Sequence, residues 1–206
     1  MRRFRIYILF TAILSTFCTA QETIKLNTPN KSGGMPIMEA FSKRASASSF
    51  DGKEFSIQDL SDLLWAANGI NRTDGKKTAP SALNAQDIDI YVFLSSGIYF
   101  YDAKENILNQ VVKGDKRSVF SRANEQAPAL LLLLVSDISK FGNNFDESNR
   151  LAWGNIDAGI VSQNIAMFCA AKGFKTRPRA SMPQGLEQMI GLKDSQKIVL
   201  NMPVSY

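Results

Sequence analysis

The sequence predicts a single α+β domain behind an export signal. Its 206 residues, 45% of them hydrophobic, suit one globular domain with a continuous core. Segments with strand character cluster between helical segments, without the regular strand–helix alternation that builds a doubly wound sheet. The continuous apolar run at 129–135, bounded by Pro128 and Asp137, predicts a fully buried central strand.

Residues 1–20 have the pattern of a secretory signal peptide. Three arginines precede an apolar run at 6–17 that is short for a membrane span, and Thr19 and Ala20 are small. We expect cleavage after Ala20, an exported, periplasmic protein, and no stable membrane insertion afterwards. A retained anchor, a lipid on Cys18 and twin-arginine export are the alternatives. Residues 21–35 are expected to form a flexible arm, and 36–206 the domain.

Composition excludes several kinds of chemistry. The net charge of the whole chain is +5, and the signal carries three arginines and no acid. The chain without its signal therefore has a net charge of only +2, which does not indicate a nucleic-acid partner. The absence of histidine excludes Ser-His-Asp and Cys-His catalysis and imidazole ligands for a metal. Cys169, the one cysteine after the signal, lies among apolar residues, which favours a buried structural thiol over a nucleophile. A bound cofactor is therefore expected to supply the chemistry.

Local patterns predict the remaining elements in chain order. Ser56 can cap a helix whose apolar residues recur on one face, and Gly69 can end it. β-Branched and aromatic residues on both sides of Ser96-Gly97 predict a hairpin. The expected helices are 36–44, 56–69, 117–124, 153–172 and 184–192; the expected strands are 88–94, 98–101, 107–112, 129–135 and 197–204. The segments 71–79 and 143–149 are expected to be loops.

Small residues recur every fourth position in the longest helix. They are Ala158, Ser162, Ala166 and Ala170. Such a stripe permits close approach of another helix, either within the chain or in a second subunit.

Four segments carry polar side chains of possible functional use. Asp87 and Asp89 alternate with apolar residues, so we expect both carboxylates on the solvent face of a strand. Arg44 and Ser46 suit a phosphate monoester, although a basic residue at a helix end is common. The segment 80–86 carries amides that suit the edge of a heteroaromatic ring, although it also fits a capping turn. The loop 176–181 can present backbone amides to a ligand.

The order of these segments resembles the FMN-dependent nitroreductase family. The matching motifs are Arg44-x-Ser46, Pro80-Ser81-Ala82-x-Asn84-x-Gln86 and Asp157-Ala158-Gly159. The stretches 63–72 and 199–204 are similar to the branch of thiazoline-oxidising, SagB-type dehydrogenases. The resemblance covers residues 36–204 and implies a central, mostly antiparallel sheet flanked by helices, in an obligate homodimer with two FMN molecules at its interface.

By this resemblance, seven residues bind the cofactor: Arg44, Ser46, Ser81, Asn84, Gln86, Ala180 and Ser181. Arg44 and Ser46 are implied to hold the phosphate and ribityl chain. The 81–86 residues are implied to contact the flavin, partly across the dimer interface. Ala180 and Ser181 are implied to place a backbone amide near flavin N5.

The sequence departs from the family pattern at two phosphate-binding positions. Ser48 stands where Arg or Lys is frequent, and Ser205-Tyr206 stand where the family continues with glycine and basic residues. Five other cations are candidates to bind the phosphate in place of the two that are missing: Arg72, Lys76, Lys77, Arg177 and Arg179. The expected function is FMN-dependent transfer of hydride or electrons from a small-molecule donor to a small acceptor such as a nitroaromatic or quinone, with no catalytic side chain. The alternative is a non-enzymatic dimeric binding protein with weak or lost flavin binding.

Overall fold

The computed structural model describes residues 22–121 and 126–206, so the expected signal peptide lies outside the described residues. Seven strands form one sheet in the order β1-β4-β3-β2-β5-β7-β6, and all the neighbouring pairs are antiparallel. The strands are β1 (Thr23–Lys25), β2 (Ile88–Leu94), β3 (Gly97–Asp102), β4 (Ile107–Lys113), β5 (Leu130–Asp137), β6 (Lys175–Thr176) and β7 (Gln196–Ser205). The expected antiparallel α+β architecture is confirmed.

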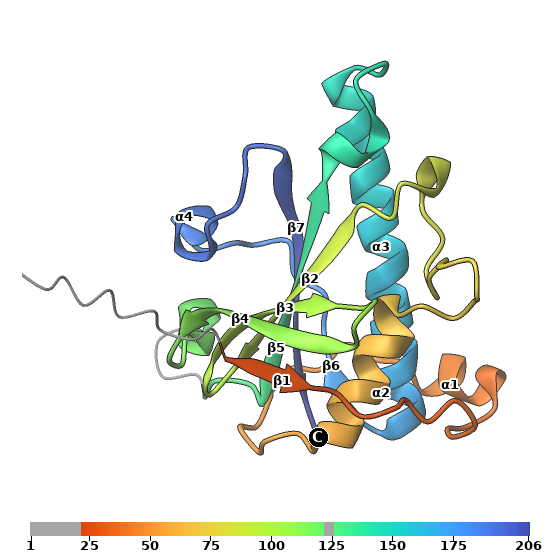
Figure 1. The fold of residues 1–206 in the computed structure, drawn as a ribbon. Helices are drawn as coiled ribbons and strands as arrows, with labels where there is room; N and C mark the ends of the chain where they lie inside the picture. Colours follow the sequence, from red (N-terminus) through yellow and green to blue (C-terminus); the bar gives the residue numbers. More distant parts are fainter. Residues whose placement is uncertain (1–21, 122–125) are drawn as a thin grey trace, which may run out of the picture.

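Helices cover both faces of this sheet unequally (Figure 1). The helices are α1 (Ile37–Lys43), α2 (Ile57–Asn68), α3 (Glu147–Lys172) and α4 (Leu186–Ile190). Residues of α2 and α3 share one core cluster with the sheet, whereas α4 contributes to a second cluster. The long α3 therefore forms the main support of one face, and the short α4 covers part of the other.

Strand β5 joins the two halves of the core. Leu130, Leu132 and Leu134 belong to the cluster on the α2–α3 side, and Leu131 and Leu133 belong to the cluster on the α4 side. Successive side chains of a strand point to opposite faces, so a strand covered on both sides needs apolar residues at every position. The prediction of a fully buried central strand is confirmed.

Helix α2 begins and ends as its sequence predicts. The hydroxyl of Ser56 accepts a hydrogen bond from the Asp59 backbone N–H at 3.0 Å, and Gly69 follows as the C-cap. The hairpin of β2 and β3 is also confirmed. These elements depend on interactions within a few residues, which is why local patterns were sufficient to place them.

The expected flexible arm at 21–35 is wrong for the part that the structure describes. Residues Thr23–Lys25 pair with β4 as an edge strand, and Leu26 is buried in the core. Farther along, Asn30 N–H donates to the Asp62 carboxylate at 2.7 Å. The segment lies at the sheet edge, where backbone hydrogen bonds hold it and most of its side chains stay exposed.

Two helix boundaries also differ from the expectation. Helix α3 begins at Glu147, with Asp146 as N-cap, so part of the expected 143–149 loop is helical. Its first turn is exposed to solvent. The polar residues there are therefore compatible with a helix and do not indicate a loop. The helix expected at 117–124 is a 3₁₀ turn over Arg117–Phe120, and residues 122–124 lie outside the described part.

The small-residue stripe of α3 packs within the chain. Ala158, Ser162 and Ala166 are all buried in the single chain, which decides between the two alternatives for these positions. A different stripe of α3 is exposed and comprises Ala152, Asn155, Ile156, Gly159 and Gln163. Within the described residues, no helix is both long enough and apolar enough to cross a membrane.

Candidate functional site

The segment after α1 is attached to strand β6. Ala47 N–H donates to the Thr176 carbonyl at 3.0 Å, which holds residues 44–48 against the β6 end of the sheet. Arg44 and Ser46 are both exposed. Among the residues that the structure describes, the Arg44 guanidinium has no ion-pair partner and is available to an anionic ligand.

The loop after β6 reaches the same region and is held by strand β7. Arg179 and Asn201 exchange backbone hydrogen bonds at 2.9 Å, and the Asn201 side-chain amide donates to the Ser181 carbonyl at 2.9 Å. Ala180 and Ser181 are exposed. Asn201, which is buried, thus fixes the loop that the sequence predicted to present a backbone amide.

A cavity of about 280 Å³ lies beneath the 44–48 segment. Ala45 and Ala47 line one side, and Ala166 and Ala170 of α3 line another. The C-terminal half of α3 therefore supports the part of the site that carries Arg44 and Ser46.

The amide-bearing segment 81–86 is a strained turn at a different position. Leu83, Asn84 and Gln86 have φ values of 54°, 55° and 50°. Non-glycine residues rarely adopt such values, and strain of this kind persists only where other contacts enforce it. The Ser81 hydroxyl accepts from Gln86 N–H at 2.8 Å, while the Asn84 side chain is exposed.

One chain does not bring all seven predicted residues together. Asp157 of α3 holds the 81–86 segment through Ala82, whereas Ala166 and Ala170 lie under the Arg44 segment. At the rise of an α-helix, Asp157 and Ala170 are about 20 Å apart. Figure 1 shows α1 and the 82–84 turn near opposite ends of α3. The predicted cofactor residues thus fall into two groups, which we call half-sites: 44–48 with 179–181, and 81–86.

The expectation that Asp87 faces solvent is wrong. Its side chain is completely buried and accepts a hydrogen bond from the Ser136 hydroxyl. Burial raises the pKa of Asp87 to about 7, and nearby Asp157 adds to the rise, while the Ser136 hydrogen bond opposes it. Strand β2 begins at Ile88. Asp87 therefore lies just before the strand, and the alternation of inward and outward side chains does not apply to it.

Asp89 also differs from the expectation, although less. Its carboxylate pairs with Lys140 at 2.9 Å and accepts from the Gln196 amide at 3.1 Å. Only 12% of its side chain is exposed. Asp89 is a structural contact at the sheet surface, not a freely solvated carboxylate.

Gly154 explains how α3 approaches Asp87 so closely. A Cβ atom added at Gly154 would overlap the Ser136 side chain and lie 3.5 Å from Asp87 Oδ2. Glycine at this position, one turn before Asp157, lets the helix place Asp157 beside Asp87. The spacing of Gly154 and Asp157 on one buried face is the sequence signal that could have pointed to this cluster.

The structure distinguishes among the cations proposed as substitutes at the phosphate. The Arg72 guanidinium donates to the Lys77 carbonyl, and Lys76 pairs with Asp74. Arg179 lies over the Phe50 ring at 5.4 Å. Arg177 directly follows Thr176, whose carbonyl binds the 44–48 segment.

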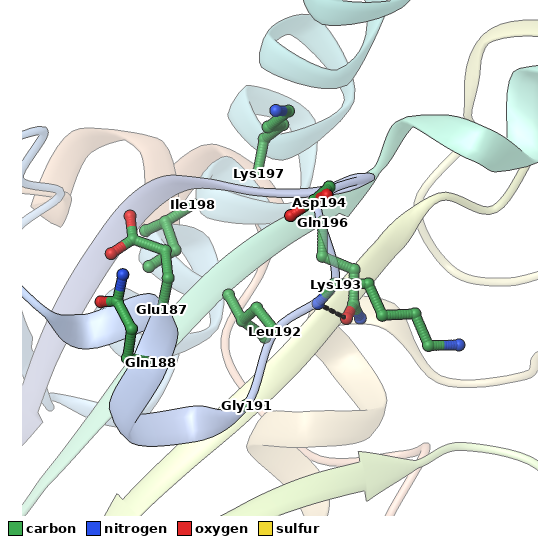
Figure 2. A pocket seen from close by; sticks show the side chains of 9 residues that line it. All are labelled: Glu187, Gln188, Gly191, Leu192, Lys193, Asp194, Gln196, Lys197 and Ile198. Carbon is green, nitrogen blue, oxygen red and sulfur yellow. Dashed lines mark hydrogen bonds between the residues drawn. The ribbon is translucent and has the colours of Figure 1, made fainter.

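A separate cavity of about 530 Å³ surrounds the turn between α4 and β7 (Figure 2). Its rim mixes acidic and basic side chains, and Lys193 N–H donates to the Gln196 side chain at 3.0 Å. None of the seven predicted cofactor residues lines it. Its size alone therefore does not make it the candidate site.

The structure is an α+β fold in which the two groups of predicted cofactor residues lie at different positions along one long helix. The family model described as "Nitroreductase family" matches residues 41–206, and the chain belongs to this family. Family and architecture together make it a nitroreductase-like oxidoreductase. No curated protein matches the chain.

Solved structures share the fold. A protein from Ralstonia eutropha classed as a nitroreductase is 28% identical, with a TM-score of 0.83 over 91% of this chain and 90% of its own. A chain of the E. coli microcin synthetase complex is 15% identical, with a TM-score of 0.70 over 99% and 84%. A protein from Staphylococcus epidermidis classed as an NAD(P)H:FMN oxidoreductase is 14% identical, with a TM-score of 0.62 over 86% and 90%.

Proposed function

We propose that this protein is an FMN-dependent oxidoreductase that passes hydride or electrons from a small donor to a small acceptor such as a nitroaromatic or a quinone. The observation that carries the proposal is the Arg44 segment, where a guanidinium without an ion-pair partner among the described residues and an exposed hydroxyl lie on a segment bonded to Thr176, which leads into the 179–181 loop. A cation, a hydroxyl and backbone amides are the donors that a flavin mononucleotide requires.

The chain's own residues bind and orient the cofactor. Arg44 and Ser46 hold the phosphate and the ribityl chain, and the loop at Ala180 presents its backbone amide to the ring. Bound FMN supplies the redox chemistry, so the protein contributes position and electrostatics. This assignment fits the absence of histidine from the sequence.

We propose that the second half-site comes from another copy of the chain. The two half-sites of one chain are too far apart to meet on one flavin, and apolar side chains near both are exposed. They are Ile37, Met38 and Phe41 on α1, Leu83 on the 82–84 turn, and Ile156 on α3. A homodimer that covers this surface brings Ser81, Asn84 and Gln86 of one copy toward Arg44 of the other.

We also propose that the protein acts outside the cytoplasm and belongs to the branch of thiazoline-oxidising dehydrogenases. The export pattern at 1–20 and the stretches 63–72 and 199–204 support these two assignments. Since NAD(P)H is absent from the periplasm, the electron donor is then a different reductant. The mass of protein recovered from the cell envelope tests the cleavage after Ala20, and a lipid on Cys18 contradicts it.

The visible spectrum of the purified protein, before and after addition of FMN, tests the proposed function. We expect flavin absorption that persists through gel filtration, and its bleaching by a chemical reductant followed by reoxidation with a quinone or nitroaromatic. A protein that binds no FMN contradicts the proposal and supports a non-enzymatic binding protein. A protein that binds FMN but does not reoxidise with either acceptor contradicts the acceptor class.

A further inference from the structure

Asp87 carries a buried oxygen without a partner. Its Oδ2 accepts from the Ser136 hydroxyl, but its Oδ1 has no hydrogen-bond partner among the described residues. A buried charged oxygen left unpaired is costly, and such a group normally changes its protonation state instead. A proton on Oδ1 turns that oxygen into a donor and needs only a nearby acceptor.

Asp157 interacts with the Asp87 side chain and can serve as the acceptor. It is 2% exposed, and it raises the pKa of Asp87 both as a hydrogen-bond partner and through its charge, in addition to the larger effect of burial. Ionising two interacting carboxyl groups together in a buried place costs free energy. One proton held between the two groups avoids that cost. Asp157 also has a second contact.

That other contact is the strained turn of the second half-site. Ala82 N–H donates to Asp157 Oδ1 at 3.1 Å and to Oδ2 at 2.9 Å. The residues after Ala82 include Leu83, Asn84 and Gln86, which have positive φ values. The chain continues from this turn into the buried Asp87. The 81–86 segment is therefore held at its start by Asp157 and at its end by Asp87.

The charged groups near the pair include Lys140, whose Nζ donates to the Gln86 carbonyl at 3.4 Å. Strand β5 presents the uncharged Ser136, and α3 presents Asp157. From the 71–79 loop, Lys77 interacts with Asp87 through its charge. Burial and then Lys140 lower the pKa of Lys77, while Asp89 and Asp87 act in the opposite direction.

We propose that Asp87 and Asp157 share one proton and act as a positioning pair that holds the 81–86 segment in its flavin-binding conformation. This inference rests on the proposed function, because the segment supplies the second half of the flavin site. Loss of the proton at high pH places two negative charges behind the turn. The strained turn then relaxes, and flavin affinity falls without any change in the residues that touch the flavin.

Flavin titrations from pH 6 to pH 9 test the pair with three proteins. Asp87→Asn keeps a donor for Asp157 and an acceptor for Ser136 but cannot titrate. Asp89→Asn is the matched control, because it removes a neighbouring carboxylate outside the pair. Riboflavin serves as the probe beside FMN, because it has no phosphate whose own ionisation changes over this range.

We expect the affinity of the wild type and of Asp89→Asn for both flavins to fall about tenfold as pH rises through 7, and that of Asp87→Asn to stay level. Equal pH dependence in wild type and Asp87→Asn overturns the proposal. So does constant affinity in all three proteins.

Hydrogen exchange of the flavin-free proteins separates this proposal from the proposed function. We expect the protection factors of the Ala82–Gln86 amides to fall above pH 7 in the wild type but not in Asp87→Asn. If they do so and no flavin binds at any pH, the proposed function fails while the pair stands. If Asp87→Asn does not fold, carboxyl ¹³C titration of the wild type decides, and an Asp87 carboxyl that titrates below pH 5 overturns the pair.

Discussion

Asp157 holds Ala82 with both of its carboxylate oxygens, at 3.1 and 2.9 Å from one backbone nitrogen. Asp157 lies on the buried face of α3, and Ala82 begins the turn that carries Asn84 and Gln86. The position of this half-site is thereby set by the packing of α3 against the sheet.

Replacement of Arg44 by Ala is expected to weaken FMN binding by at least about 2 kcal/mol, roughly thirtyfold, because a charge-assisted contact to the phosphate is lost. Riboflavin binding should change far less. Fluorescence titration of both flavins makes the comparison, with Lys43→Ala as the control, since Lys43 is paired with Glu39. Equal losses for both flavins mean that Arg44 supports the fold and does not bind phosphate.

The dimer surface is tested by Ile156→Glu. Ile156 is 59% exposed on the outer stripe of α3, so a charge there is tolerated in a monomer but is buried in the proposed dimer. Light scattering over a dilution series should show a dimer for the wild type and a shift toward monomer for Ile156→Glu. Val111→Glu, which places the same charge at an exposed apolar position on β4, should remain dimeric. A wild type that is monomeric at micromolar concentration contradicts the two-chain site.

Gly154→Ala should destabilise the protein by about 1–3 kcal/mol, because the added Cβ overlaps the Ser136 side chain in a packed core. Gly159→Ala, five residues later in the same helix, is the matched control. Within one chain nothing lies within 4 Å of a Cβ there, so helix propensity predicts a gain of about 0.5–1 kcal/mol when both glycine variants are made in the monomeric Ile156→Glu background. Urea unfolding of both variants measures the difference. Equal stabilities would show that α3 and β5 are not in close contact at Gly154.

The pH dependence of stability should identify Asp87. Its pKa is raised from 3.8 to about 7 by burial and by Asp157, so the folded state keeps a proton that the unfolded state has lost. Stability should therefore fall as pH rises from about 4 to about 7, by at most about 4 kcal/mol, and level off above. Carboxyls with a lowered pKa, such as Asp115 beside Arg117, act in the opposite direction and only below about pH 4.

Asp87→Asn should flatten the decline between pH 4 and pH 7, because the asparagine side chain does not titrate. Urea unfolding at intervals across this range, with Asp89→Asn in parallel, makes the comparison. An unchanged slope in Asp87→Asn assigns the decline to another group.

Most elements were predictable because their causes are local. The Ser56 cap, the β2–β3 hairpin and the apolar run of β5 each depend on residues a few positions apart, and the structure confirms them. The edge strand β1 was not predictable in this way. Its partners on β4 are more than 80 residues away, and the contacts run through the backbone, which carries no sequence signal.

The sequence by itself determined the fold class, the family resemblance and the identity of the candidate cofactor residues. Only the tertiary structure decided where these residues lie. It separated Arg44 from Asn84 along α3, and it turned Asp87 from an expected solvated carboxylate into one member of a buried pair. The physical reason is that burial and charge interaction depend on which elements pack together. The close packing of α3 on the sheet at Gly154 brings Asp157 beside Asp87, 70 positions away in the sequence.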